Sequence, residues 1–201
     1  NRFNRNTGGT LVEKCCHFFD LMHLVAGAHP VRVMASGGQD VNHLDEEYEI
    51  DGRMERPDIL DNAFVIVEFA NGVRGALDLC MFAEGARYQE EIAAVGPLGK
   101  IECLVPGPGR FWPKLLGEPP VPQLIISPRA PKGPFMSEIP VDPTLLEAGD
   151  HNGSTFYQHQ RFNAVVRGEG KVEVTLADGA KAIAIGLAAQ ESARTGQALM
   201  L

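Results

Sequence analysis

A carboxylate, an imidazole and a second carboxylate stand at helical spacing near the start of the chain. They are Glu13, His17 and Asp20, and residues three or four apart are neighbours on a helix surface. A carboxylate beside an imidazole can orient it and tune it for proton transfer. The same residue types can also share a cation, or form an ordinary solvated helix face. The spacing alone leaves all three interpretations open.

These side chains are predicted to lie on one helix over residues 10–26. Gly8 and Gly9 precede this helix, and Gly27 stands where a left-handed C-cap belongs. Apolar residues at helical spacing form an arc opposite the polar line and predict the side that packs on a core. The arc consists of Leu11, Val12, Cys15, Phe18, Phe19, Met22, Val25 and Ala26.

Composition limits the kind of protein that this chain can be. Hydrophobic residues make up 44% of its 201 residues, enough for a sizeable core. The net charge of −8 argues against nucleic acid or an anionic membrane as a partner. No apolar run reaches the length of a membrane span, and the four cysteines form no C-x-x-C pair, which favours a cytoplasmic protein with reduced thiols. Because the chain opens on Asn1 without a methionine, we expect a piece of a longer protein.

Strand patterns follow the helix. A half-buried strand is predicted over residues 30–35, and an acidic loop over residues 36–61. The strongest signal is Asn71-Gly72 between apolar runs at 63–70 and 73–82, which favours a hairpin with a type I′ turn.

Further strands are predicted over residues 88–95 and 100–105, joined by a turn. Together with the hairpin they suggest one antiparallel meander. Weaker strand patterns occupy residues 123–127, 135–141 and 172–174.

Two helices close the predicted fold. Ser154 or Thr155 is expected to cap the first, which ends at Gly168, and Thr175 caps the second, over residues 177–194. One helix, a run of strands and two helices indicate an α+β fold with a mostly antiparallel open sheet and helices on one face.

The motif Gly8-Gly9-x-x-x-Glu13-x-x-x-His17-x-x-Asp20 resembles the G-G-x-x-x-D-x-G-x-H-x-x-D signature of the Gfo/Idh/MocA oxidoreductases. Residues 95–102 resemble the family's G-x-x-G-x-x-E turn, and residues 162–165 and 178–196 resemble its last helices. The resemblance covers essentially the whole chain. It implies the C-terminal, dihydrodipicolinate-reductase-like domain of a two-domain enzyme, with residues 1–201 as a single substrate-binding and dimerisation domain.

The resemblance also implies a reaction, in which hydride passes between NAD or NADP and a hydroxyl carbon of a sugar or cyclitol. Carried over to this chain, His17 would accept and donate the proton, Glu13 would orient it, and Asp20 would support the helix face. The expected partners are a small polyol substrate and further copies of the chain, which would pair through the open sheet.

Three departures from the family pattern matter. Glu13 stands where most members have Asp, and Cys15 replaces a Gly. The chain contains no G-x-G-x-x-G after a strand and no Glu-Lys-Pro motif, so the cofactor cradle and the family's lysine are missing. We therefore expect the nucleotide to be bound mainly by a missing N-terminal domain, and this chain to be inactive alone.

Other residues are weaker candidates for contacts with a substrate. Lys14 lies beside the motif, where it could replace the missing lysine or simply extend its stem along apolar surface. Arg5 precedes the motif, and His151 and Tyr157 lie in or near a later loop. Two other functions stay open: a redox-inactive sugar sensor or assembly domain, and a metal-dependent lyase or isomerase.

Overall fold

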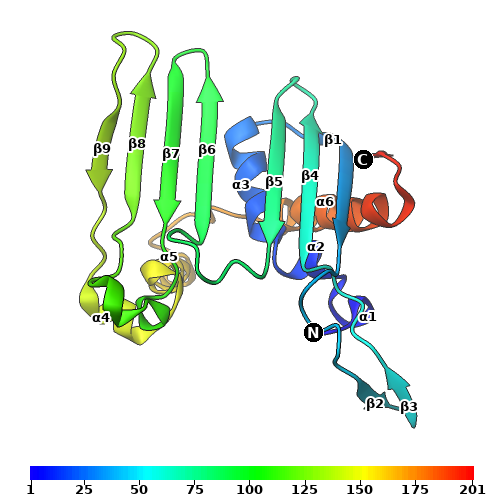
Figure 1. Ribbon diagram of the computed structural model, residues 1–201. Helices are drawn as coiled ribbons and strands as arrows, with labels where there is room; N and C mark the ends of the chain where they lie inside the picture. Colours follow the sequence, from blue (N-terminus) through cyan, green and yellow to red (C-terminus); the bar gives the residue numbers. More distant parts are fainter. The chain divides into compact units, whose positions relative to one another are not determined.

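The computed structural model describes residues 1–201, which divide into two compact units. Unit 1 comprises Asn1–Phe82 and Val174–Leu201, and unit 2 comprises Ala83–Glu173. Each unit contains an antiparallel sheet and helices (Figure 1). This confirms the predicted α+β fold class. That residues 1–201 act as a single substrate-binding and dimerisation domain stays a prediction.

The sheet of unit 1 has the strand order β10-β1-β4-β5. Its strands are β1 (Pro30–Gly38), β4 (Asn62–Phe69), β5 (Arg74–Cys80) and β10 (Leu199–Met200). Alternate residues of β4 are buried, as expected for a strand with one covered face. Val65 and Val67 point into the core, whereas Phe64 and Ile66 lie on the opposite, open face.

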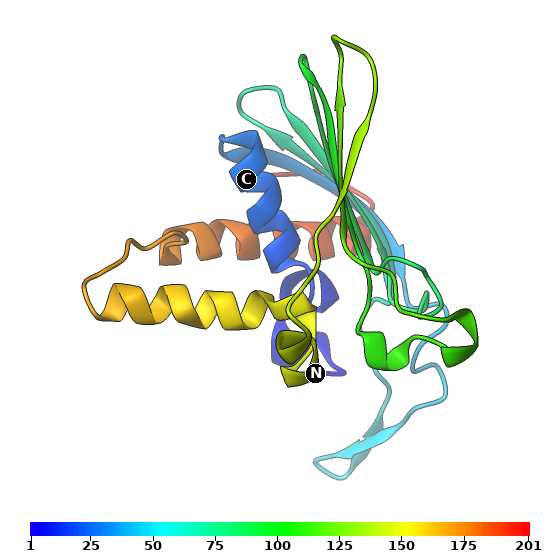
Figure 2. The same cartoon turned by 90° about the vertical axis from the view of Figure 1, so that its left-hand side faces the viewer.

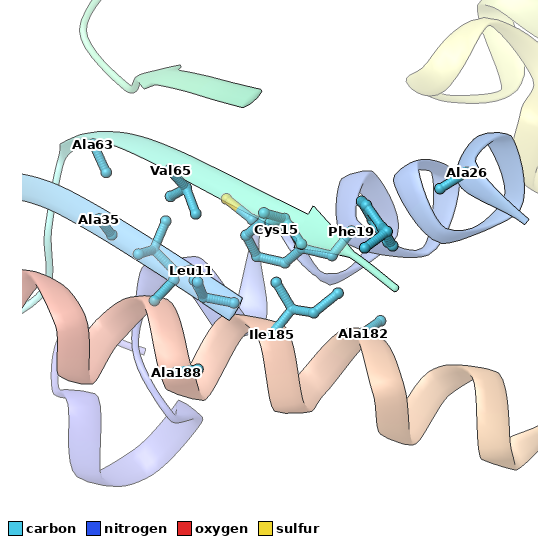
Figure 3. Close-up of a cluster of buried hydrophobic side chains, with 14 residues drawn as sticks. Leu11, Cys15, Phe19, Ala26, Ala35, Ala63, Val65, Ala182, Ile185 and Ala188 are labelled. Carbon is cyan, nitrogen blue, oxygen red and sulfur yellow. The ribbon is translucent and has the colours of Figure 1, made fainter. Parts of the chain in front are cut away.

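Helices cover one face of this sheet (Figure 2). They are α2 (Thr10–Glu13), α3 (Cys16–Ala26) and α6 (Leu176–Thr195), and a short helix α1 (Asn4–Thr7) precedes them. Leu11, Phe19 and Ile185 meet in the core between these helices and the sheet, and each is fully buried (Figure 3). Thr175 and Asp178 form a capping box at the start of α6, which confirms the predicted cap.

The prediction of one continuous helix over residues 10–26 is wrong at Lys14 and Cys15. The N–H of Lys14 donates to the carbonyl of Thr10 (2.9 Å), which is the last hydrogen bond of α2. The next residue, Cys15, has φ −113° and ψ −5°. This break changes the chain direction, so that α2 packs on α6 whereas α3 packs on both α6 and β5. The break also fits Cys15 where the family pattern has Gly, because its φ is open to any residue.

The ends of α3 show one confirmed and one wrong expectation. Gly27 is the left-handed C-cap, with φ 62°. Val25, predicted to lie on the apolar arc, is 58% exposed because it falls in the last turn, beside the exposed Leu24.

The β4–β5 hairpin is confirmed, but its turn type is not the predicted one. Only Gly72 has a positive φ (82°), so Asn71-Gly72 is not a type I′ turn. The N–H of Gly72 donates to the carbonyl of Phe69, and the N–H of Phe69 donates to the carbonyl of Val73 (both 2.9 Å). These two hydrogen bonds close a three-residue loop. The Asn71 amide donates to the carbonyl of Ala26 (2.8 Å), and this contact with α3 favours the longer loop.

The predicted acidic loop over residues 36–61 contains a second hairpin. Its strands, β2 (Tyr48–Ile50) and β3 (Arg53–Glu55), extend away from the unit 1 sheet (Figure 1). Asp51 and Gly52 form its turn with φ 50° and 75°, which is the type I′ geometry that was predicted for the β4–β5 hairpin. The overlooked signal was the Asp-Gly pair itself.

Asp61 anchors the segment that precedes this hairpin. Its side chain is 2% exposed and accepts hydrogen bonds from the backbone N–H groups of Asp40, Val41 and Asn42, at 2.6–3.1 Å. Burial by itself would raise the pKa of Asp61, but these donors and the Asn62 amide hold the pKa below its usual value.

The sheet of unit 2 has the order β6-β7-β8-β9. Its strands are β6 (Glu90–Gly96), β7 (Gly99–Val105), β8 (Gln123–Pro128) and β9 (Phe135–Glu138). The predicted strands are therefore present, but the single meander is wrong because β5 and β6 belong to separate sheets. The residues between them form a turn of their own, in which Ala86 donates to Ala83 (2.9 Å).

Two helices and three 3₁₀ turns complete unit 2. They are α4 (Pro143–Ala148), α5 (Ser154–Val166), η1 (Gly109–Phe111), η2 (Lys114–Leu116) and η3 (His151–Gly153). Helix α4 lies in a predicted loop, and residues 172–174 form no strand. The N-cap of α5 is Gly153 rather than Ser154 or Thr155, because the left-handed turn at residues 151–153 leads directly into the helix. None of the helices combines the length and apolar content needed to cross a bilayer.

Candidate functional site

The break between α2 and α3 reshapes the predicted catalytic line. Glu13 is the last residue of α2, whereas His17 lies in the first turn of α3. The three side chains therefore do not form a single line along one helix. Asp20 remains one turn beyond His17 on α3, and it is half-buried.

Glu13 is held as a carboxylate by two donors. The Asn1 amide donates to its Oε1 at 3.1 Å, and the Lys14 ammonium lies 3.4 Å from the same atom. The hydrogen bond from Asn1 outweighs partial burial and, with the charge of Lys14, lowers the pKa of Glu13. At neutral pH this side chain is an acceptor and a negative charge, as required of a group that orients an imidazole.

His17 is solvent-exposed at the start of α3. Its ring packs against that of Phe18, with ring centres 4.1 Å apart and planes inclined at 48°. Because Phe18 packs against the core cluster, it offers His17 a fixed surface while the imidazole stays accessible to a ligand. The position fits a residue that exchanges protons with a bound molecule.

Lys14 and Arg5 have different surroundings, although both were candidates for substrate contacts. Lys14 is half-exposed and its ammonium pairs with Glu13, next to the candidate catalytic residues. Arg5 forms an ion pair with Glu55 and lies over the Phe3 ring at 4.7 Å. The hydrogen bond that Arg5 donates to the Glu55 carboxylate raises the pKa of Arg5. The structure therefore gives Arg5 a role in attaching α1 to the β2–β3 hairpin.

His151 and Tyr157 belong to unit 2, whereas Glu13 and His17 belong to unit 1. His151 has φ 68° and lies in the left-handed turn before α5. Tyr157 is 47% exposed on the first turns of α5 and meets the ring of Phe156 edge-on. Beside them, Arg110 forms a two-pronged ion pair with Asp150.

The geometry also shows whether the residues of this chain could bind a metal ion or a dinucleotide. No group of three or more histidine, cysteine or acidic side chains converges in the way that a metal ion needs. All three sheets are antiparallel, so none contains the strand–turn–helix crossover that cradles a pyrophosphate. The residues of this chain do not fit a dinucleotide site.

Sequence reasoning missed a second polar cluster, around Glu46. Glu46 accepts hydrogen bonds from the Tyr48 hydroxyl (2.7 Å) and Arg2 (3.3 Å), and its other oxygen lies 2.7 Å from Nδ1 of His43. These contacts, that of Tyr48 above all, lower the pKa of Glu46 to about 2. The acidic run gave no signal for this cluster because Arg2 is remote in sequence.

Comparison with known proteins places this chain in a family. A family model described as "Oxidoreductase family, C-terminal alpha/beta domain" matches residues 1–201. The chain belongs to this family, the Gfo/Idh/MocA oxidoreductases. The motif that carries Glu13 and His17 is thus part of an oxidoreductase family domain. A search of characterised protein sequences found no match.

Solved structures share the fold at low sequence identity. A putative oxidoreductase from Thermotoga maritima is 19% identical with a TM-score of 0.65, and the match covers 98% of this chain and 49% of that one. An Agrobacterium radiobacter oxidoreductase, solved with NAD+, L-tartaric acid and magnesium, is 18% identical with a TM-score of 0.65, covering 94% and 48%. The aldose-aldose oxidoreductase of Caulobacter crescentus, complexed with glycerol, is 16% identical with a TM-score of 0.59, covering 96% and 48%. The chain spans about half the length of these structures.

Proposed function

We propose that this oxidoreductase domain is the substrate side of an NAD(P)-dependent dehydrogenase that acts on a hydroxyl carbon of a sugar or cyclitol. The observation that carries the proposal lies at the junction of α2 and α3. There, an ionised Glu13 and an exposed His17 stand four residues apart within a family motif. The polyhydroxylated ligands of two similar structures, L-tartaric acid and glycerol, support a polyol-like substrate.

In this proposal His17 takes the proton of the substrate hydroxyl as the carbonyl forms. A nicotinamide, when bound, would provide the acceptor for the hydride of the same carbon. Glu13 orients the imidazole and stabilises the positive charge that it gains, and Asp20 supports the helix face behind it. Lys14 would contact a substrate hydroxyl while it remains paired with Glu13. His151 and Tyr157 are proposed as further substrate contacts from unit 2.

The cofactor is proposed to be NAD or NADP, bound mainly by a part of the full-length protein outside these residues. A titration of NADH and NADPH into the 201-residue chain tests this, followed by fluorescence or heat. We expect no saturable binding below about millimolar concentration, because the chain has no phosphate cradle. Tight saturable binding would contradict the proposal.

The activity itself is tested with the full-length protein. Myo-inositol, glycerol, L-tartaric acid and aldoses are each offered with NAD+ and NADP+, and the absorbance of reduced nicotinamide is followed. We expect His17→Ala to lower kcat/KM by about 10²–10⁴-fold and Glu13→Gln by about tenfold or more, because proton transfer is lost or misdirected. The matched control is His23→Ala, six residues further along α3, which should change kcat/KM less than about twofold.

Two outcomes would overturn the proposal. Full activity of His17→Ala would remove the proposed base. Saturable sugar binding without turnover under any condition would favour the redox-inactive sensor.

We also propose that a second copy of the chain docks on the open face of the unit 1 sheet. Phe64, Met34 and Ile66 lie there, 65%, 44% and 40% exposed, beside an Arg32–Glu68 ion pair at 3.1 Å. An apolar patch with a charged rim is typical of a protein interface. Phe64→Lys should convert an oligomer to a smaller species in light scattering, with the fold retained. An unchanged mass would contradict this surface.

A further inference from the structure

The start of α2 is in close contact with the last third of α6. There, the Nε2 of Gln190 donates to Oδ1 of Asn4 at 3.0 Å, directly over Gly9. A Cβ on Gly9 would lie 1.6 Å from that Nε2 and 2.6 Å from the Asn4 oxygen. With φ +94°, Gly9 also has a backbone conformation that side chains rarely adopt. The second glycine of the family motif therefore makes room for the Gln190–Asn4 hydrogen bond.

Asn4 is itself fixed from two sides. Its backbone N–H and its side-chain amide both donate to Asp58, each at 2.7 Å, and its carbonyl accepts the N–H of Gly8 at 2.8 Å. Because the Asn4 amide nitrogen donates to Asp58, the orientation of the Asn4 side chain is fixed and its Oδ1 needs a donor. The Gln190 amide must therefore point its nitrogen towards this oxygen. The Oε1 of Gln190 is left buried without a hydrogen-bond partner. An unpaired buried acceptor is unfavourable, so Gln190 is a poor choice if packing stability were its only role.

The contact bears directly on Glu13. The carbonyl of Gly9 accepts the N–H groups of Val12 (3.1 Å) and Glu13 (2.9 Å), which are the first hydrogen bonds of α2. This helix has four residues and no side-chain cap, so it depends on outside contacts. The position of Gly9 therefore decides where the Glu13 carboxylate lies.

We propose that Gln190 is a positioning residue, which holds the Gly9 turn through Asn4 and thereby sets the Glu13 carboxylate for its work on His17. The inference rests on the proposed function of Glu13. It adds a group from α6, remote in sequence, to the requirements of the site.

The test compares Gln190→Glu, Asn4→Ala and Ser192→Ala in the full-length protein. Gln190→Glu keeps the size of the side chain but replaces its donor with an oxygen that faces the Asn4 oxygen. Asn4→Ala removes the same hydrogen bond from the other side, in case the first variant folds poorly. Ser192 is the matched control, because it is buried on α6 two residues later and instead accepts the N–H of Ala35 at 2.8 Å.

Two measurements are made on each variant. Hydrogen exchange of the Val12 and Glu13 amides should accelerate by about tenfold or more in Gln190→Glu and Asn4→Ala, and stay within about twofold in Ser192→Ala. With the best polyol of the panel, kcat should fall by about tenfold at a KM within about twofold of wild type, because a positioning loss acts on the chemical step. In a Glu13→Gln background the same Gln190→Glu change should have little further effect.

The outcomes separate the inference from the proposed function. If Glu13→Gln is impaired but Gln190→Glu leaves exchange and kcat unchanged, or if the two effects simply multiply, the positioning role is overturned alone. If no polyol is turned over, or if Glu13→Gln is fully active, the role of Glu13 is overturned and this inference with it.

Discussion

The two units differ most in where their apolar side chains lie. The core cluster, with Phe19, Leu11 and Ile185 at its centre, lies wholly in unit 1. In unit 2, by contrast, Phe162 is 65% exposed and Leu115 is 87% exposed, and α5 buries none of its residues. The difference shows that unit 1 has a hydrophobic core of its own, whereas unit 2 depends mainly on strand pairing. We expect unit 2 to open at lower free energy than unit 1.

Truncation of one phenylalanine in each unit tests this comparison most directly. Phe19→Ala should lower the free energy of unfolding by about 4 kcal/mol, because it leaves a cavity in a fully buried cluster. Phe162→Ala should change it by less than about 0.5 kcal/mol, since this ring is exposed. Urea unfolding followed by circular dichroism measures both. Equal losses would contradict the assignment of the core to unit 1.

Glycine substitutions sharpen the comparison for close backbone contacts. Gly9→Ala should cost about 3 kcal/mol, because both its φ and the nearby Gln190 amide exclude a side chain. Gly117 of unit 2 has a similar φ of +82° with nothing within 4 Å, so Gly117→Ala should cost only about 1 kcal/mol. Thermal melts of the two variants compare the two losses of stability. A larger loss of stability in Gly117→Ala than in Gly9→Ala would argue against tight packing of unit 1.

Carboxylates provide a third contrast. Asp61→Asn should lower the free energy of unfolding by about 2 kcal/mol, because an amide cannot accept all the hydrogen bonds that three backbone N–H groups donate to the buried Asp61 side chain. Asp150→Asn in unit 2 should cost clearly less, since its partner Arg110 is exposed and can be solvated. The denaturant midpoints of Asp61→Asn and Asp150→Asn are compared. Indistinguishable midpoints would contradict the role of Asp61 as an anchor.

The smallest effect on stability is expected when the pH is lowered. The contacts with Tyr48, His43 and Arg2 lower the folded-state pKa of Glu46 from 4.5 to about 2. A lowered carboxyl pKa stabilises the fold above the unfolded pKa, and this contribution is lost as the pH falls from about 4.5 towards 2. Hydrogen exchange in residues 43–48 should therefore accelerate over this range, and Glu46→Gln should abolish that dependence. An unchanged acid response in the variant would contradict this role.

Local patterns in the sequence anticipated most of the fold. The period of two in β4, the capping box at Thr175 and the C-cap at Gly27 all depend on near neighbours, and all three are present. The motif residues Glu13 and His17 were recognisable for the same reason. The two-residue turn at Asp51 was equally local, but the surrounding acidic run concealed it.

The tertiary structure decided what near neighbours cannot encode. The periodicity of residues 10–26 is equally compatible with a straight helix, and only packing of α2 on α6 and of α3 on β5 places a break at Lys14 and Cys15. The assignment of β5 and β6 to separate sheets also depends on which strands pair across the fold. The contact between Gln190 and Asn4 joins residues 186 positions apart. By itself, the sequence determined most of the elements and the candidate proton-transfer residues. Long-range packing determined the direction and the supports of these elements, because such contacts form only when remote segments meet.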